Sequence, residues 1–213
     1  MKYEWRKAEK KFYRPKPKPE KVVIPKFKFF TVAGEGNPND EYFAEYIGVL
    51  YSLSYAVKMS PKKGIEPNGY FDYTVYPLEG VCDIKEDAKK EFAGTLYKDD
   101  LVFNLMMKQP DFVNQEFADM IIELVKKNKP HELLDKVKFD EIKDGTCVQM
   151  LHLGRYDDEP QSFKLMEEYA EENGLVRKSK VHREIYLSDA RKVAPEKLKT
   201  VLRFQVKGNN EKQ

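Results

Sequence analysis

The sequence has few cysteines, histidines and tryptophans and no long apolar run. Its 213 residues include 2 Cys, 3 His and 1 Trp. Neither Cys82 nor Cys147 has a neighbour at metal-ligand spacing, and the histidines form no HxH or HxxxH pair. No apolar run approaches the roughly 18 residues of a membrane helix. These absences exclude a disulfide scaffold. From them we expect no metal, no cofactor, no membrane contact and a soluble protein of the reducing cytoplasm.

Aromatic and apolar residues are plentiful by comparison. The chain is 41% hydrophobic and 13% aromatic, and 13 of its aromatic residues are tyrosines. Tyrosine has an apolar ring and a polar hydroxyl, so such a surplus suits wet pockets as well as buried cores. The composition therefore predicts a globular protein with a well-formed core, and it is compatible with a wet aromatic pocket.

Charge is divided unevenly along the chain. The first 30 residues carry 11 Lys and Arg against 3 Asp and Glu, a net charge of +8, and the remainder carries 27 against 33, a net of −6. Alternating prolines in residues 1–26 favour an extended arm. Such an arm could contact nucleic acid, or it could pack as a strap on the acidic body, anchored by Trp5, Phe12 and Tyr13. We favour the strap and do not expect direct nucleic-acid binding.

Hydrophobic periodicity and turn residues predict a repeated order of strand, helix, strand and strand. We expect strands at residues 26–36, 70–77, 101–107, 146–153, 181–187 and 198–206, and helices at residues 40–59, 115–127 and 159–173. Asn114 is a candidate cap for the second of these helices.

This order indicates an α+β fold of two βαββ modules related by a pseudo-twofold axis. The expected arrangement is an antiparallel sheet with its helices on one side and a ligand cleft between the modules. We place a single domain at residues 27–213, with module one at 27–110, a connecting helix at 112–137 and module two at 144–207.

The stretch at residues 181–189 holds the candidate site. Strand side chains alternate in direction, so His182, Glu184 and Tyr186 are predicted on one face, with Arg183 and Ile185 on the other. A carboxylate between two rings in mid-strand has two interpretations. It lies on a solvated face with a basic partner, or it forms the floor of an aromatic pocket and there binds a cation or acts as a base.

Five stretches in order resemble the GyrI-like small-molecule-binding family over nearly the whole chain. They are residues 50–58 (LYSLSYAVK), 76–80 (YPLEG), 108–113 (KQPDFV), 152–160 (HLGRYDDEP) and 182–189 (HREIYLSD). The resemblance implies a cleft lined with aromatic residues and a glutamate at its base, which corresponds to Glu184. One branch, which this chain resembles in lacking a helix-turn-helix segment, contains hydrolases that open the cyclopropane ring of DNA-alkylating natural products. The chain departs from that branch at Val81-Cys82, where a Trp is common.

The resemblance leads to a mechanistic hypothesis without a cofactor. Glu184 would take a proton from water, and the hydroxyl of Tyr55 or Tyr73 would position the water or the ligand carbonyl. Further ligand contacts are expected from Tyr51, Phe71, Tyr73, Phe103, His152 and Tyr186. His152 is expected to be structural or to line the pocket rim. The alternatives are a binder or sensor of amphipathic cationic drugs, which would use charge and cation–π attraction, and an interaction protein similar to the gyrase inhibitor.

Overall fold

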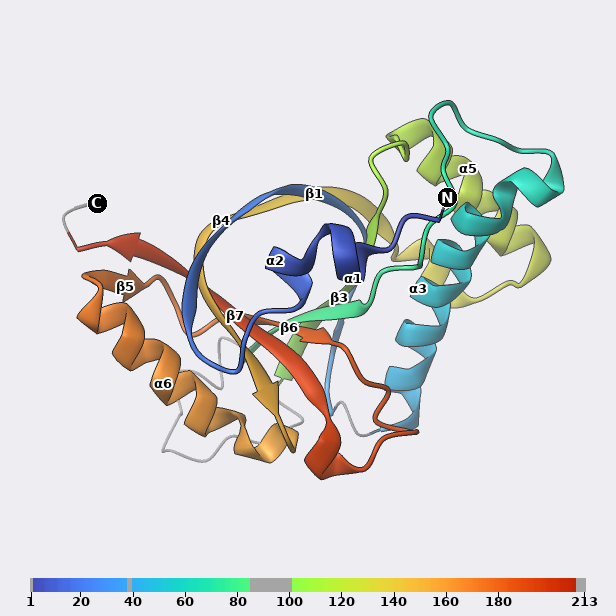
Figure 1. Cartoon of the computed structure of the whole chain (residues 1–213). Coiled ribbons are helices and arrows are strands. Elements are labelled where there is room, and N and C mark those ends of the chain that lie inside the picture. The colour runs from blue at the N-terminus through green and yellow to red at the C-terminus, as the bar shows by residue number, and fades with distance from the viewer. Residues whose placement is uncertain (1, 38–39, 85–100, 210–213) are drawn as a thin grey trace. The chain divides into compact units, whose positions relative to one another are not determined.

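The computed structural model describes residues 2–37, 40–84 and 101–209, and these form two compact units (Figure 1). The first unit comprises Met1–Glu4 and Phe27–Ile142. The second comprises Trp5–Lys26 and Lys143–Gln213. Two long strands, β1 (Glu20–Glu35) and β4 (Lys138–Leu153), contribute residues to both units.

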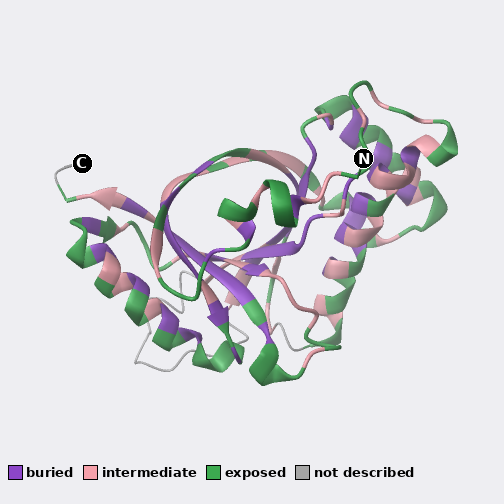
Figure 2. Cartoon of the chain, viewed as in Figure 1, coloured by how far each residue is buried: buried purple, intermediate pink, exposed green. Residues whose placement is uncertain are grey.

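The first unit is built on an antiparallel sheet in which β3 lies between β1 and β2. The elements of this unit follow the predicted order: β1, α3 (Glu41–Met59), β2 (Leu78–Ile84), β3 (Leu101–Gln109) and α5 (Gln115–Asn128). Gly34 pairs with Phe103, and Gly80 pairs with Leu105. The buried face of α3 includes Leu50, Leu53 and Val57 (Figure 2). Because β3 is flanked on both edges, its buried side chains form the centre of this unit's core.

The second unit repeats the order with one additional short strand. Its elements are α1 (Trp5–Ala8), α2 (Lys10–Tyr13), β4, α6 (Glu159–Glu172), β5 (Leu175–Arg177), β6 (His182–Tyr186) and β7 (Lys199–Gly208). Over residues 200–203, β7 pairs antiparallel with β4 on one edge and with β6 on the other. Met166 and Ala170 of α6 pack on Val148, Leu202 and other buried side chains of β4 and β7. Both units thus have the strand–helix–strand–strand order, which confirms the predicted α+β class.

The three predicted long helices are confirmed to within one or two residues. The α5 helix begins where predicted, because the Asn114 side chain accepts a hydrogen bond of 2.8 Å from the Phe117 backbone N–H. The α3 helix ends before Pro61, and the following turn of Ser60–Lys63 stops at Gly64, whose φ is 74°. Helix caps and breakers therefore located these boundaries correctly.

The prediction of a strand at residues 70–77 is wrong. In this segment Tyr73 forms only one isolated parallel bridge, to Tyr3, and the strand β2 begins just after Pro77. Proline has no N–H for a ladder. The segment is instead fastened to α3, since Lys58 forms an ion pair of 2.7 Å with Asp72 and donates to the backbone oxygen of Tyr73. Aromatic residues that suggested a strand are here packed as a side-chain cluster.

The basic N-terminal arm is less extended than predicted. It contains the short helices α1 and α2, and its last residues already belong to β1, which begins at Glu20 rather than at residue 26. Trp5 and Tyr13 are buried with ring centroids 5.2 Å apart, and Phe12 is half-buried. The Arg203 side chain donates to the Phe12 carbonyl oxygen at 2.6 Å. The arm is therefore an integral part of the second unit.

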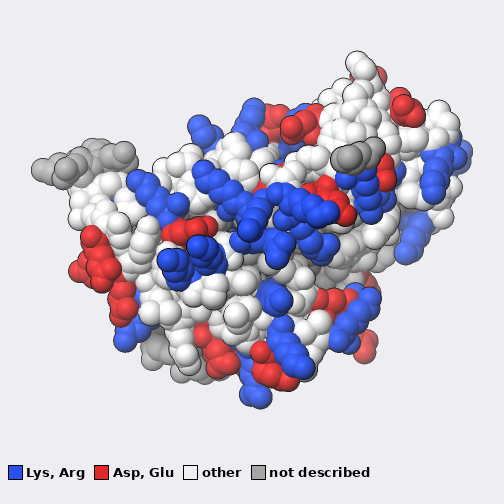
Figure 3. All heavy atoms as spheres, in the orientation of Figure 1, with Lys and Arg blue, Asp and Glu red and all other residues white. Residues whose placement is uncertain are grey.

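Exposed basic side chains gather on the arm (Figure 3). They are Arg6, Lys7, Lys10, Lys11, Arg14, Lys16 and Lys18. The expectation that this surface does not bind nucleic acid stays a prediction. Among the helices that the structure describes, none is both long and apolar enough to span a membrane.

Candidate functional site

The β6 strand presents three polar side chains on one face, as its alternating pattern predicts. His182, Glu184 and Tyr186 are half-buried, whereas Arg183 and Ile185 on the opposite face are buried. The alternation is therefore confirmed. It brings one carboxylate between an imidazole and a phenol of the same strand.

The Glu184 carboxylate is held at both of its oxygens. The Nε2 atom of His182 lies 3.1 Å from Oε1, and the Tyr186 hydroxyl donates to Oε2 at 2.9 Å. Hydrogen bonds to a charged group stabilise by about 1.5–3 kcal/mol each. The side chain of Glu184 is 14% exposed, and a carboxylate has lone pairs beyond the two used here. Glu184 is thus fixed in position and can still accept a hydrogen bond from water.

The opposite face of β6 anchors the strand. Arg183 forms a bidentate pair with Asp144 of β4, with its Nε and an Nη atom 2.8 and 2.9 Å from the two carboxylate oxygens. Both side chains are largely buried, and bidentate geometry fixes orientation as well as distance. Glu184 in turn pairs with Leu202 in the ladder to β7. These contacts fix the direction in which the Glu184 side chain points.

Two residues of the α6 entry lie at this site and were missed by the sequence analysis. The Tyr156 and Tyr186 rings meet edge to face with centroids 6.1 Å apart. Burial, together with the charges of Glu184 and Glu159, raises the pKa of Tyr156 to about 12. Glu159, at the first position of α6, is buried. Desolvation by burial, followed by the charges of Glu184 and Asp157, raises its pKa to about 9.

No sequence signal other than the helix start pointed to Glu159. Glu159 and Pro160 were interpreted as the beginning of a helix, which they are, and as the end of the family-like stretch at residues 152–160, without a role in the site. Proximity to Glu184 arises from the fold of the second unit and has no counterpart in residue spacing. His182 was placed on the correct face but was not assigned to the site.

His152 has a structural environment. Its ring is buried, with Nδ1 2.8 Å from the Ser162 hydroxyl and Nε2 2.8 Å from the Arg155 carbonyl oxygen. Because a carbonyl oxygen only accepts, Nε2 carries a proton and donates to it. His152 therefore links the end of β4 to the start of α6. Its assignment as a ligand contact stays a prediction.

The other predicted site residues belong to the first unit, where they have contrasting environments. Tyr51 and Tyr55 on α3 are stacked with centroids 6.4 Å apart, and Tyr55 is 51% exposed. Tyr73 is buried, its hydroxyl faces the Ser54 carbonyl oxygen at 3.4 Å, and burial raises its pKa. Tyr55 thus presents a reachable hydroxyl, whereas that of Tyr73 is enclosed.

The remaining two aromatic residues of the first unit also differ in exposure. The exposed Phe71 ring meets that of Tyr73 with centroids 6.3 Å apart. Phe103 is buried against Tyr46 and over Gly34, where an added Cβ would lie 2.6 Å from the Phe103 ring. The contacts that these residues would make with a ligand stay predictions. Cys82, at the position where the hydrolase branch often has a Trp, lies on β2 opposite Phe103 of β3.

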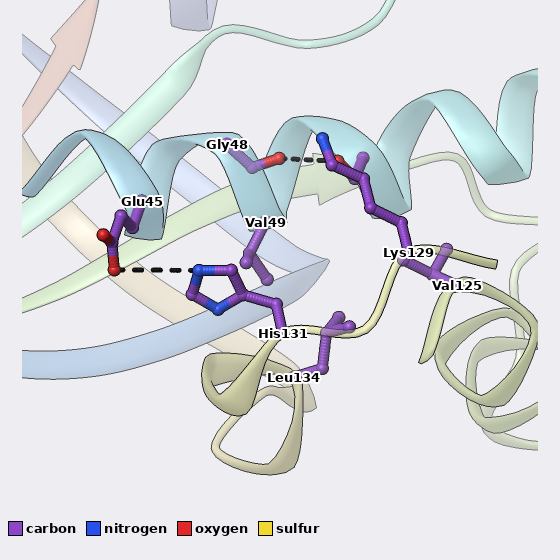
Figure 4. A pocket seen from close by; sticks show the side chains of 8 residues that line it. Glu45, Gly48, Val49, Val125, Lys129, His131 and Leu134 are labelled. Atoms are coloured by element: carbon purple, nitrogen blue, oxygen red, sulfur yellow. Dashed lines mark hydrogen bonds and ion pairs between the residues drawn. The ribbon is translucent and has the colours of Figure 1, made fainter. Parts of the chain in front are cut away.

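A separate hollow lies in the first unit, among α3, α5 and the turn Glu132–Asp135 (Figure 4). Its volume is about 220 Å³, and Val49, Val125 and Leu134 form its apolar wall. His131 and Glu45 form a long pair of 3.7 Å at its edge. None of the predicted site residues lines it, so we assign it no part in the function proposed below. Within the described residues, no cluster of His, Cys, Asp and Glu side chains could hold a metal ion.

Among the solved structures similar to this chain are two from Listeria innocua, each described as a hydrolase. They are 35% and 36% identical to this chain with TM-scores of 0.86 and 0.87, and each comparison covers 97% of this chain and 100% of the other. The C-terminal domain of EcmrR shares the fold alone, at 13% identity and a TM-score of 0.54, covering 90% of this chain and 98% of that domain. A comparison with curated proteins gives no match.

The sequence also matches a family description directly. Residues 17–207, most of the chain, match the GyrI-like small-molecule-binding domain. The matched range includes every predicted site residue, and it agrees with the two modules found in the structure. This chain belongs to the family of GyrI-like small-molecule-binding domains.

Proposed function

We propose that this chain is a cofactor-independent hydrolase that opens the cyclopropane ring of flat DNA-alkylating compounds by adding water, and so protects the cell from them. In this proposal Glu184 is the general base. Full-length similarity to the two Listeria innocua proteins described as hydrolases supports an enzymatic function. The cyclopropane substrate rests on the resemblance of the five sequence stretches.

The observation that carries the proposal is the environment of Glu184. A general base must be fixed in position, must be reachable, and must keep a lone pair for the proton. His182 and Tyr186 fix the carboxylate, and the side chain remains partly exposed. The rings of Tyr156 and Tyr186 beside it offer an apolar wall for a flat ligand. An ordinary surface ion pair does not combine these features.

The proposed reaction needs one base and one water molecule. Water attacks a ring carbon while Glu184 takes one of its protons. The strained carbon–carbon bond breaks, and its electron pair moves into the conjugated carbonyl, whose oxygen becomes an oxyanion. The proton then returns to that oxygen. The product is the substrate plus one water, and the carboxylate is regenerated.

A second candidate function is binding of amphipathic cations without turnover. The same geometry favours it, because a carboxylate beside two tyrosine rings attracts a cation by charge and by cation–π interaction. The two functions differ in the ligand that they prefer. A hydrolase accepts neutral flat electrophiles, whereas a cation binder prefers positively charged dyes.

The test is incubation of the purified chain with a cyclopropane-bearing DNA alkylator, followed by mass spectrometry. The proposal predicts a product heavier than the substrate by one water, formed faster than in buffer. A Glu184→Gln variant serves as the matched control. If the alkylator is recovered unchanged while a cationic dye binds, the second candidate replaces the first.

A further inference from the structure

Glu159 is a buried residue with one carboxyl oxygen that lacks a hydrogen-bond partner among the described residues. The residue is only 7% exposed, and the oxygen in question is Oε1. Burying an ionised carboxylate in this way costs far more free energy than burying a neutral acid. Buried polar atoms in folded proteins are almost always paired, so an unpaired one needs an explanation.

Its place in the fold connects Glu159 to the Glu184 site. It follows Tyr156 by three residues through a tight helical turn, so both side chains leave the chain on the same side. Tyr156 contacts Tyr186, and Tyr186 donates to Glu184. His152 braces this segment at the Arg155 carbonyl oxygen and at Ser162. Glu159 therefore shares a side of the chain with Tyr156, which contacts the site, and the charge of Glu184 acts on its carboxyl.

We propose that Glu159 is the second carboxyl of the Glu184 site and is held there as the neutral acid, so that the pair carries a single negative charge. This inference rests on the proposed function for its consequence in catalysis, but the protonation state itself does not. Glu159 acts through Glu184 and is a positioning residue.

Two charged groups near Glu159 favour its neutral form. They are Glu184 on β6 and Asp157 in the preceding turn, while the phenol of Tyr156 is uncharged at pH 9 and His152 on β4 directs its ring to Ser162 and Arg155. A negative charge that acts on a buried carboxyl disfavours its ionisation. Desolvation and these charges raise the pKa of Glu159 to about 9. At neutral pH the proton therefore stays on Glu159.

A single charge suits the proposed reaction. The carbonyl oxygen becomes negative as the ring opens, and a second carboxylate beside it would oppose that charge. Above about pH 9 Glu159 ionises. Turnover is then expected to fall, and affinity for a cationic dye is expected to rise several-fold.

The experiment compares the wild-type protein with Glu159→Gln, and with Glu172→Gln as a matched control at an exposed position of the same helix. Infrared spectra at pH 7.5 should show the carbonyl band of a protonated carboxylic acid in the wild type and in Glu172→Gln, and no such band in Glu159→Gln. In the wild type this band should disappear with a midpoint near pH 9, a measurement that needs no variant. Identical spectra for all three proteins, or a band that disappears near pH 5, would overturn the inference.

Two further measurements separate this inference from the proposed function. Turnover by Glu159→Gln, relative to its own rate at pH 7.5, should lack the alkaline fall of the wild type, and its affinity for a cationic dye should not change between pH 8 and 10. If the wild type shows no turnover, the proposed function fails while the infrared and dye results still decide the protonation of Glu159. If turnover is present but falls in the same way above about pH 9 in the wild type and in Glu159→Gln, then ionisation of Glu159 does not cause the fall and its expected effect on catalysis is wrong.

Discussion

Replacing Glu159 by Gln should stabilise the protein, increasingly so as the pH rises. Below pH 4.5 the carboxyl is protonated in both the folded and the unfolded chain. Between pH 4.5 and about 9 the unfolded chain has lost this proton while the folded chain keeps it. The folded state then binds more protons than the unfolded state, so its stability falls as the pH rises. Glutamine has no proton to lose, and the variant escapes this penalty.

The magnitude follows from the linkage of proton binding to folding. Each pH unit within this window costs about 1.4 kcal/mol. From pH 5 to pH 8 the free energy of unfolding of Glu159→Gln should therefore rise relative to wild type by at most about 4 kcal/mol. This is a large share of the roughly 5–15 kcal/mol that stabilises a typical domain.

Urea denaturation at pH 5, 6, 7 and 8 measures this difference directly. Glu172→Gln is the control, because it removes an exposed carboxylate from the same helix. Other groups titrate in both proteins, so the quantity that matters is the difference between variant and wild type at each pH. A difference that stays constant across this range would refute the assignment of a buried neutral acid.

Three other variants test the roles expected of Tyr55, Tyr73 and Asp144. Tyr55→Phe should lower turnover by roughly 10-fold or more, because in the hypothesis drawn from the family resemblance this exposed hydroxyl positions the water or the ligand carbonyl. Tyr73→Phe should leave kcat within about 3-fold, since its hydroxyl is enclosed near Ser54; equal losses in the two variants by steady-state kinetics would contradict the distinction. Asp144→Asn should destabilise the protein by about 1.5–3 kcal/mol, because it breaks the charged hydrogen bonds to Arg183. Urea denaturation checks this, and a loss below 0.5 kcal/mol, a typical surface effect, would contradict it.

Local patterns accounted for much of the fold. The period-two alternation of residues 182–186 placed Glu184 and Tyr186 on the same face correctly, because a strand with one buried face has a strictly specified register. Caps and breakers located the long helices, including α5 after Asn114. These features depend only on neighbouring residues, so they can be predicted from the sequence.

Features that depend on distant residues were predicted less well. The aromatic segment at residues 70–77 has the composition of a strand, yet its polar groups bind Lys58 and Tyr3. The arm forms short helices because Trp5 and Tyr13 bury their rings together. Glu159 lies 25 positions before Glu184 in the sequence, and only folding places its carboxyl where that charge acts on it. Such long-range effects leave no periodic trace in a single sequence.

The central claim, that Glu184 is a general base, is tested most directly by comparing turnover and affinity in Glu184→Gln. Glutamine keeps the size of the side chain but cannot accept a proton at neutral pH. The account predicts that hydration of a cyclopropane-bearing alkylator slows by roughly 100- to 10,000-fold, while affinity for a neutral flat ligand changes little. Loss of affinity for a cationic dye with no turnover in either protein would indicate a cation anchor. Full turnover by Glu184→Gln would contradict the account.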